Sequence, residues 1–285
     1  MKRWSVNPFV TEKDSGVRVA DPKTLGRRGD LVAETKVFYV CCSCKRDTHT
    51  KWGKIREKSP EHRVCISCFA KSRRVAFRED AFDFLDSNTL YWIGYIAGDG
   101  NVTRPKKSQM KVSIKSIDDD ILEKFSSFLG IPGRKSGNIV WVYSNKIASQ
   151  LLELGITERK STTIKIRHDI SQSADFWRGL VDSDGTVALS AYDGRKNVYP
   201  MVVYGSGSID LITQYVDWCE SLTGRRQTIY EDMRPNNHIY KVRFMGTLAV
   251  VILKTLYGSC DSSVSLDRKR NKALEYIDMH ERKYA

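Results

Sequence analysis

Two short segments of the chain place an acidic residue directly after a run of apolar and small residues. The first, YWIGYIAGDG, spans residues 91–100 and contains Gly94, Gly98 and Asp99. The second, FWRGLVDSDG, spans residues 176–185 and also ends on an aspartate and a glycine. Glycine inside a helix costs about 1 kcal/mol relative to alanine. A helix that keeps two glycines four residues apart therefore indicates a close contact on one face.

The two segments predict a pair of helices that cross with their backbones in contact. Residues four apart lie on one face of a helix, and small side chains there let a second helix approach closely. The residues expected at this helix interface are Gly94, Gly98, Gly179 and Ser183. If the two faces meet, the helix ends converge and the aspartates that follow lie side by side.

Asp99 and Asp184 are therefore the candidate catalytic residues. Two carboxylates held together repel each other, and the pKa of at least one rises unless a cation neutralises the pair. Hard divalent cations with oxygen ligands do this in proteins, which favours Mg²⁺. Metal ions at such a site can activate water and stabilise a leaving oxygen, as in phosphodiester hydrolysis. One copy would indicate only an acid that ends a helix, whereas two matched copies indicate a site.

The net charge points to a polyanionic partner. The 285 residues include 47 Lys and Arg against 34 Asp and Glu, a formal net charge of +13 with a pI near 9.4. Residues 1–85 hold 19 Lys and Arg against 11 Asp and Glu, a net charge of +8 in less than a third of the chain. A basic excess of this kind favours nucleic acid as the partner.

Four of the seven cysteines form two CxxC pairs, which predict a structural zinc site. Each pair lets two thiolates reach one tetrahedral Zn²⁺, and two pairs complete a site with no open position. The expected ligands are Cys41, Cys44, Cys65 and Cys68. Cys42 stays open as a substitute for Cys41, because Cys42-x-Cys44 is also a conceivable pair. An odd cysteine count without a secretory signal argues against a disulfide framework.

The elements that position these residues are expected to form two repeats behind a small module. Residues 1–35 are expected to be a basic arm, and residues 36–85 a four-cysteine zinc module with a basic helix after its second CxxC pair. The first repeat is expected over residues 86–170 and the second over residues 171–285. The two aspartates lie 85 residues apart, which is the repeat length.

Each repeat is predicted to have the order αββαββα, which makes an α+β fold with pseudo-twofold symmetry. The aspartate-bearing helix begins each repeat, and Ser87 or Asn88 is the expected N-cap of the first. A second hairpin is expected over residues 134–145 in the first repeat and over residues 225–246 in the second. A last helix, from about residue 266 to 283, closes the chain.

Alternation along the predicted strands separates an apolar face from a polar one. In MKVSIK (residues 110–115) and IYKVRF (residues 239–244), alternate side chains are apolar and cover the helices. The polar faces are left for bases and phosphates. The candidate DNA-binding residues on these and neighbouring strands are Lys111, Ser113, Lys115, Ser190, Tyr192, Arg226, Thr228, Tyr230, Lys241 and Arg243.

The segments WIGYIAGDG and WRGLVDSDG resemble the two motifs of the LAGLIDADG homing endonucleases in their single-chain, two-motif form. The repeat, the element order and the run RGLVDSDGTV extend the resemblance over roughly residues 86–285. The first copy departs from the motif at Ala97 and Gly98, neither of which is the position of the metal-binding acid.

The resemblance implies a monomeric endonuclease that cleaves both strands of double-stranded DNA at a long, asymmetric target site. Asp99 and Asp184 would bind the catalytic Mg²⁺, and we expect the backbone of Gly98 and Ser183 to contribute ligands. Two saddle-shaped antiparallel sheets would lie in the DNA major groove. Both strands would be cut across the minor groove, leaving short 3′ overhangs.

The resemblance also implies a basic residue near each metal centre. Symmetric candidates are Lys160 and Lys269, each in an Arg-Lys pair after the last helix of its repeat, and Lys165 is a rival for Lys160. A lysine near the phosphate can stabilise developing charge or tune the attacking water. The zinc module beside such a core is expected to extend DNA contact.

Two rival functions use the same fold: an RNA-splicing maturase that binds intron RNA, and a DNA-binding regulator with an inactive core. The presence of both aspartates favours the nuclease. No segment approaches the ~20 apolar residues that span a bilayer, and the N-terminus lacks the apolar core of a secretory signal. We expect a soluble protein of the host-cell cytoplasm, from a gene carried by an intron, a phage or an organelle.

Overall fold

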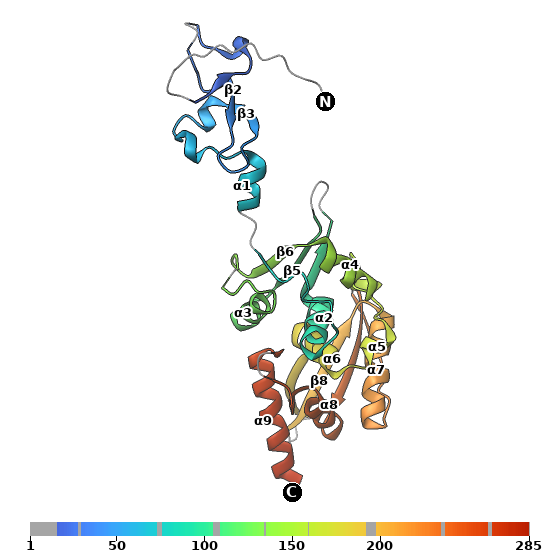
Figure 1. Cartoon of the computed structure of the whole chain (residues 1–285). Coiled ribbons are helices and arrows are strands. Elements are labelled where there is room, and N and C mark those ends of the chain that lie inside the picture. The colour runs from blue at the N-terminus through green and yellow to red at the C-terminus, as the bar shows by residue number, and fades with distance from the viewer. Residues whose placement is uncertain are drawn as a thin grey trace. The chain divides into compact units, whose positions relative to one another are not determined.

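The computed structural model describes residues 16–27, 30–72, 76–104, 109–133, 135–158, 160–191, 198–234, 237–261 and 264–284. The chain divides into two compact units, residues 1–75 and residues 76–285 (Figure 1). Among the described residues, no helix is long and apolar enough to cross a membrane. The α+β class with antiparallel sheets is confirmed.

The first unit is built on a three-stranded antiparallel sheet in the order β1-β2-β3. Its elements are β1 (Arg18–Val19), β2 (Lys36–Val40), β3 (Asp47–Lys51) and helix α1 (Ile66–Ser72). A small apolar core is formed by Val17, Val37, Tyr39 and Ile55. Because β1 pairs with β2, this part of the arm expected over residues 1–35 belongs to the sheet.

Among its described residues, the first repeat of the second unit has three strands where four were expected. Its elements are α2 (Ser87–Asp99), β4 (Gly100–Thr103), β5 (Lys111–Lys115), α3 (Asp119–Phe128), β6 (Ile139–Tyr143) and α4 (Asn145–Glu153), with sheet order β4-β5-β6. In place of a strand before β6, Ser136 makes an isolated bridge to Ile139. The chain turns too tightly here for a longer pairing, with Gly137 at a φ of 56°.

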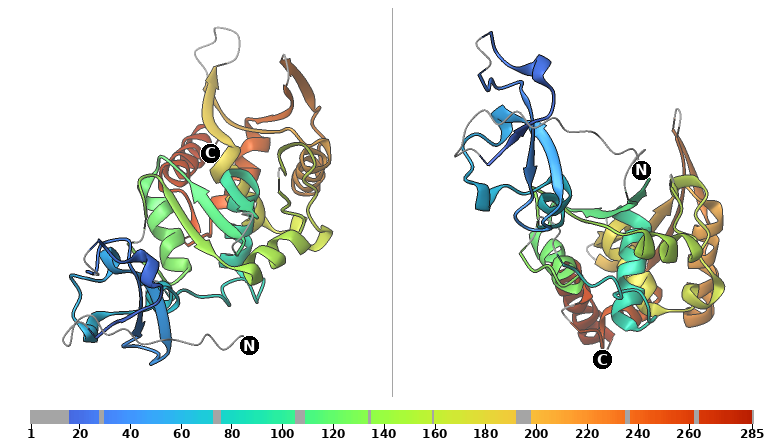
Figure 2. Two further views of the ribbon diagram at one scale, coloured as in Figure 1. Left: turned by 90° about the horizontal axis from the view of Figure 1, so that it is seen from above. Right: turned by 45° about the horizontal axis from the view of Figure 1, so that its top comes forward.

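The second repeat has the full expected order. Its elements are α6 (Ala174–Asp184), β7 (Thr186–Ala191), β8 (Val198–Ser206), α7 (Ile209–Thr223), β9 (Tyr230–Arg234), β10 (Asn237–Met245) and α8 (Thr247–Tyr257), followed by α9 (Asp267–Tyr284). The sheet order is β7-β8-β10-β9. A 3-10 turn (Lys160–Thr162) and helix α5 (His168–Ser171) connect the repeats. The green strands of repeat 1 and the gold and orange strands of repeat 2 lie on opposite sides of α2 (Figure 2, left).

Equivalent tryptophans anchor the first helix of each repeat in its own half of the core. Trp92 of α2 and Trp177 of α6 are both buried. The Trp92 ring centre lies 4.9 Å from that of Phe125 in α3, and the Trp177 ring centre lies 5.1 Å from that of Tyr215 in α7. Removing a buried tryptophan side chain costs about 3–5 kcal/mol. These contacts therefore fix each helix against the layer behind it.

Side-chain caps set where the two helices begin. The Asp86 carboxylate accepts a hydrogen bond from the Thr89 backbone N–H at 2.8 Å, so Asp86 is the N-cap of α2. The expected caps, Ser87 and Asn88, lie inside the first turn. In α6, Ser173 is the N-cap. An N-cap contributes about 0.5–2 kcal/mol to a helix, so both starting points are well defined.

Helices α2 and α6 cross with their backbones in contact (Figure 1). A Cβ atom built on Gly94 would lie 1.9 Å from the carbonyl oxygen of Phe176, and one built on Gly179 would lie 2.0 Å from the carbonyl oxygen of Tyr91. The two contacts are reciprocal, because each glycine meets the carbonyl three residues before the other glycine. No side chain larger than glycine fits at either position without separating the helices.

Gly94→Ala tests this crossing, because a helix contact and an open helix surface predict opposite changes in stability. On an open helix surface the substitution stabilises by about 1 kcal/mol, because alanine has the higher helix propensity. Here the added methyl group meets the Phe176 carbonyl oxygen, and overpacking of this kind costs about 1–3 kcal/mol. We expect a lower melting temperature than that of the wild type, measured by circular dichroism. A higher melting temperature would show that this face meets no backbone.

Candidate active site

Asp99 and Asp184 are the last residues of α2 and α6. The crossing continues to this point, because a Cβ atom on Gly98 would lie 1.9 Å from Ser183 Oγ and 2.9 Å from an Asp184 carboxylate oxygen. The Asp184 carboxylate therefore lies against the last turn of α2. The structure brings together all four small residues expected at the helix interface, and both acids lie at the convergent ends.

Burial raises the pKa of both carboxyl groups. The pKa of Asp99 rises through burial, an effect that the charges of Lys269 and Lys160 partly oppose. The pKa of Asp184 rises to about 6, through burial first and then through the nearby charge of Asp99. Burial thus destabilises the carboxylate form of each acid, and a bound cation would offset this effect.

Lys160 and Lys269 close the ends of the two helices that carry the acids. The Lys160 ammonium group donates to the carbonyl oxygens of Gly98 and Gly100, at 2.9 and 2.6 Å. The Lys269 ammonium group donates to three carbonyl oxygens, those of Val181, Asp182 and Gly185, at 2.8, 2.8 and 2.6 Å. The last carbonyls of a helix have no partner within it, and a cation there complements the helix dipole.

Both lysines lie beside the acids, where burial destabilises their charged form. Burial lowers the pKa of Lys160, and it lowers the pKa of Lys269 to about 8; the nearby aspartates oppose both shifts. The rival, Lys165, is exposed and pairs with Asp210 at 3.6 Å. The structure therefore places Lys160, rather than Lys165, at the end of α2.

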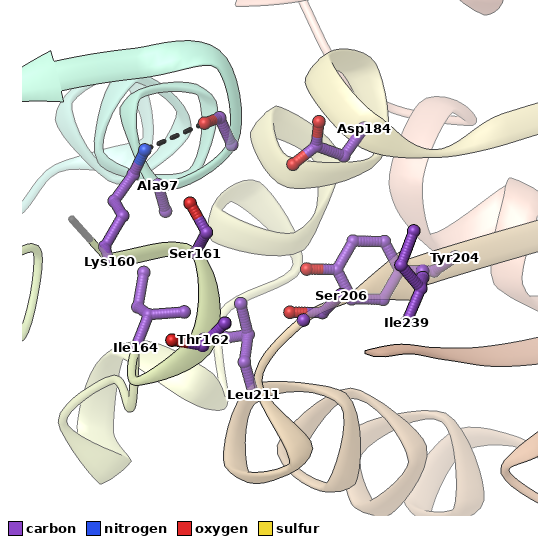
Figure 3. A pocket seen from close by; sticks show the side chains of 13 residues that line it. Ala97, Lys160, Ser161, Thr162, Ile164, Asp184, Tyr204, Ser206, Leu211 and Ile239 are labelled. Carbon is purple, nitrogen blue, oxygen red and sulfur yellow. Dashed lines mark hydrogen bonds between the residues drawn. The ribbon is translucent and has the colours of Figure 1, made fainter. Parts of the chain in front are cut away.

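A cavity lies beside each acid. The cavity next to Asp184 has a volume of about 320 Å³, and Lys160 and Tyr204 are among its lining residues. Figure 3 shows Lys160 and Asp184 reaching it from opposite sides. The cavity next to Asp99 has a volume of about 430 Å³ and is also lined by Asp118 and Arg268. Each acid thus has a cavity of its own.

The donor set at the helix ends fits a hard divalent cation. Carboxylate and carbonyl oxygens are the ligands that Mg²⁺ prefers, and the two acids supply the charge that such an ion neutralises. Of the two expected backbone ligands, the Gly98 carbonyl already accepts a hydrogen bond from Lys160, which leaves it one lone pair. At Ser183 the hydroxyl group donates to the Leu180 carbonyl at 2.9 Å within α6, and its backbone oxygen stays a predicted ligand.

Asp182 is a buried residue near the site that sequence analysis missed. Its carboxylate accepts hydrogen bonds from Tyr91 and Tyr257 hydroxyl groups, at 2.9 and 2.7 Å, and from the Leu266 backbone N–H at 2.7 Å. Burial raises the pKa of Asp182 to about 6 against the effect of these donors. Because the donors come from distant parts of the chain, spacing gave no signal for this network. It fixes the segment that leads to Lys269.

On the first sheet the three candidate DNA-binding residues have different surroundings. Lys111 Nζ lies 5.3 Å from the centre of the Trp141 ring, and Lys115 is exposed. Ser113 is 8% exposed, because it lies in register between Asn101 of β4 and Trp141 of β6. Ser113 thus departs from the open polar face expected of it. Trp141, which sequence analysis did not single out, shares the face of Lys111.

On the second sheet three candidates gather in one hollow. Tyr230 and Lys241 are opposite each other in the β9–β10 pair, and Arg243 lies two residues further along β10. All three line a hollow of about 500 Å³. Lys241 also pairs with Asp232 at 2.6 Å, which sequence analysis did not anticipate. Ser190 is half-buried on β7.

Two further candidates of this sheet lie off its strands. Arg226 and Thr228 precede β9 instead of forming part of it. Arg226 pairs with Asp217 and Glu220 of α7, both at 2.7 Å, so its guanidinium group is directed to the helix. Tyr192 lies outside the described residues.

The four expected zinc ligands meet in the first unit. One ligand atom from each of Cys41, Cys44, Cys65 and Cys68 lies within 4.8 Å of the others, and Cys42 is not among them. The sulfur atoms of Cys44 and Cys65 are 3.9 Å apart. Tetrahedral Zn²⁺ with Zn–S bonds of about 2.3 Å requires sulfur atoms about 3.8 Å apart, so the spacing fits the ion.

Backbone hydrogen bonds prepare two of these sulfur atoms for a metal. Cys41 Sγ accepts from the Cys65 N–H at 3.2 Å, and Cys65 Sγ accepts from the Cys68 N–H at 3.4 Å. Bonds from the Cys44 and Cys65 backbone lower the pKa of Cys41 to about 6, which favours the thiolate that binds metal. The basic helix expected after Cys68 begins earlier, at Ile66.

Comparison with known proteins finds similarity in fold only. No family model and no curated protein matches the sequence. The chain is similar to the structure "The homing endonuclease I-WcaI bound to its DNA recognition sequence", with 11% identity, coverage of 73% of this chain and 91% of that one, and a TM-score of 0.45. It is similar to the LAGLIDADG meganuclease I-AabMI bound to uncleaved DNA, with 10% identity, coverage of 70% and 92%, and a TM-score of 0.46.

A third similar structure is that of I-DmoI in complex with DNA and Ca, with 16% identity, coverage of 66% of this chain and 97% of that one, and a TM-score of 0.43. The chain is thus similar to LAGLIDADG homing endonucleases. At these identities and TM-scores the similarity does not reach the chemistry, which rests on this chain's own residues.

The zinc content of cysteine variants shows whether Cys41 or Cys42 is the zinc ligand. Cys65→Ser should reduce bound zinc from about one ion per chain to none and expose the amides of β2 and β3 to hydrogen exchange, because two CxxC pairs are needed for a closed site. The matched control Cys42→Ser should keep its zinc, since Cys42 lies outside the cluster. Zinc is measured by plasma emission spectroscopy. Loss of zinc from Cys42→Ser with retention in Cys41→Ser would reverse the assignment.

Proposed function

We propose that this chain is a site-specific, metal-dependent DNA endonuclease that acts as a monomer and cuts both strands of a long, asymmetric target. The observation that carries this proposal is the convergence of Asp99 and Asp184 at the ends of two crossing helices, with one cavity beside each acid. A pseudo-twofold pair of centres matches the two antiparallel strands of a duplex. The net charge of +13 favours such a polyanion.

In this proposal each acid serves one scissile phosphate. Asp99 and Asp184 would hold Mg²⁺, together with backbone oxygens of Gly98 and Ser183. When bound there, Mg²⁺ would supply a lower pKa for a water ligand and a positive charge for the phosphate oxygens. Lys160 and Lys269 hold the helix ends in place through the carbonyls that they bind, and their charges favour the phosphate in the transition state.

The outer faces of the two sheets would contact the DNA. Lys111 and Lys115 on the first sheet, and Tyr230, Lys241 and Arg243 on the second, present donors and aromatic surface of the kind that bind phosphates and base edges. We propose that they lie in the major groove and that cleavage occurs across the minor groove, leaving 3′ overhangs. The DNA complexes of I-WcaI and I-AabMI are consistent with this type of partner.

The zinc module would add DNA contacts and no chemistry. A closed site of four cysteines offers no position for water or substrate, and residues 1–85 carry +8 of the net charge. We also propose that the chain is divided into an arm, a zinc module and two repeats. We propose that the protein acts in the cytoplasm of a host cell. Loss of each phosphate contact flattens the log–log salt dependence of binding by about 0.9, so Cys65→Ser should bind a long duplex with a shallower slope.

Cleavage of a randomised duplex library tests the proposed function. The full chain with Mg²⁺ should select one long sequence, and both its strands should be cut. Asp184→Asn and Asp99→Asn should bind the selected duplex as tightly as wild type and fail to cut both strands, because the substitution removes the metal-binding charge. Asp278→Asn, a matched change on the exposed side of α9, should cut normally.

Each alternative outcome has its own meaning. Binding of the wild type to RNA without DNA cleavage would indicate a maturase, and selective DNA binding without cleavage would indicate an inactive regulator. Near-normal cutting by Asp184→Asn would contradict the catalytic assignment.

A further inference from the structure

An ion pair lines the cavity beside Asp99, and the described residues that line the cavity beside Asp184 form no such pair. Asp118 and Arg268 both line the cavity next to Asp99. Arg268 Nε donates to both carboxylate oxygens of Asp118, at 2.9 and 3.1 Å. The side chain of Asp118 is 19% exposed and that of Arg268 is 50% exposed. The acid is thus held inside the cavity wall, while half of the arginine faces outward.

The carboxylate of Asp118 pairs with Arg268 and does not cap its own helix, α3. Asp118 is the N-cap residue of α3 but makes no capping hydrogen bond with its side chain. Such a bond contributes about 0.5–2 kcal/mol, so the carboxylate gives up a local stabilising contact to reach Arg268. The pair joins the first repeat to the start of α9, 150 residues further along the chain.

The surroundings fix Arg268 in relation to the active site. Lys124 of α3 donates to the Ser265 carbonyl at 2.8 Å and to the Asp267 carboxylate at 2.6 Å. The Asp267 N–H donates to Asp120 at 3.1 Å. The next residue after Arg268 is Lys269, which closes the end of α6. Arg268 therefore lies between residues that bond to α3 and a lysine that bonds to the end of α6.

The other repeat has no counterpart of this carboxylate. Asp118 and Ser208 are equivalent, because each is an N-cap whose backbone N–H donates to the serine two residues before it, Ser116 or Ser206, at 3.1 and 3.0 Å. Ser208 caps α7, and its hydroxyl group donates to the Ile164 carbonyl at 2.7 Å. An acid that orients a guanidinium group is thus built into one half of the site.

Arginine retains donors for a ligand after pairing through Nε. The guanidinium group has five N–H donors in a planar fork, and this fork matches the oxygens of a phosphate. We propose that Arg268, oriented by Asp118, contacts the phosphate of the DNA strand that is cleaved at Asp99, so that the centre for this strand has an arginine donor held by an acid. This inference rests on the proposed function and adds to it a strand-specific residue.

Strand-resolved cleavage tests the inference. The substrate is a supercoiled plasmid that carries the selected target once, and primer extension reports which strand is nicked and how fast. Arg268→Gln should slow one defined strand by about ten- to hundredfold, the effect of one charge-assisted hydrogen bond, with little change in the other. Nicked plasmid with the break on a single strand should therefore accumulate.

Three further variants show whether the effect is local. Arg268→Lys keeps the charge without the fork and should slow the same strand less. Asp118→Asn should also slow that strand alone, because it loosens the arginine without removing it. Arg282→Gln, a change on the same helix at a side chain paired with Asp278, should leave both strands at wild-type rates. A general loss of folding would slow both strands together.

The outcomes separate this inference from the proposed function. If the wild type cuts and Arg268→Gln slows both strands equally, or neither, Arg268 has no strand-specific role and the inference is overturned. If Arg268→Gln fails to fold, the comparison of Arg268→Lys with Asp118→Asn decides in the same way. If the wild type cuts no selected DNA, the proposed function fails and the inference fails with it.

Discussion

The close approach of α2 and α6 is the constraint on which the rest of the second unit depends. The two helices touch backbone to backbone because Gly94 and Gly179 carry no side chain. Strand β4 begins directly after α2, and β7 begins directly after Gly185 at the end of α6. The crossing therefore sets three things at once: the distance between the two acids, the place where each sheet starts, and the pseudo-twofold relation between the repeats.

Bringing two acids to one point has an electrostatic cost that the surrounding residues offset. Burial raises the pKa of Asp99 and Asp184, and two lysines lie close enough to oppose this shift. Those lysines are buried in turn, and the carbonyl oxygens at the helix ends hold their ammonium groups. Asp182 ties the segment before Lys269 to α2 and α8. The acids thus sit in a rigid frame that a divalent cation would complete.

Features that depend on local pattern could be predicted from the sequence, whereas those that depend on distant partners could not. The four-residue spacing of Gly94 and Gly98 predicted a helix contact, and the two CxxC pairs predicted a metal-ligand cluster. In each case the pattern lies within a few residues of the chain. The strand expected at Ser136 is a turn, since β propensity does not reveal whether a partner strand is within reach. The contacts of Asp182 and Arg268 could not be predicted, because their partners lie 75 to 150 residues away.

Whether the helix crossing couples the cation centres at the two acids can be measured most directly by Mn²⁺ titration of the zinc-loaded full chain, followed by electron paramagnetic resonance. The titration is made for the wild type, Asp99→Asn, Asp184→Asn and the double variant. If the crossing joins the carboxylates, each single substitution weakens Mn²⁺ binding and the double variant loses much less than the sum of the two, as coupled residues do. Additive losses, or unchanged binding in either single variant, would show that the two acids do not influence each other's cation binding and would contradict this view of the site.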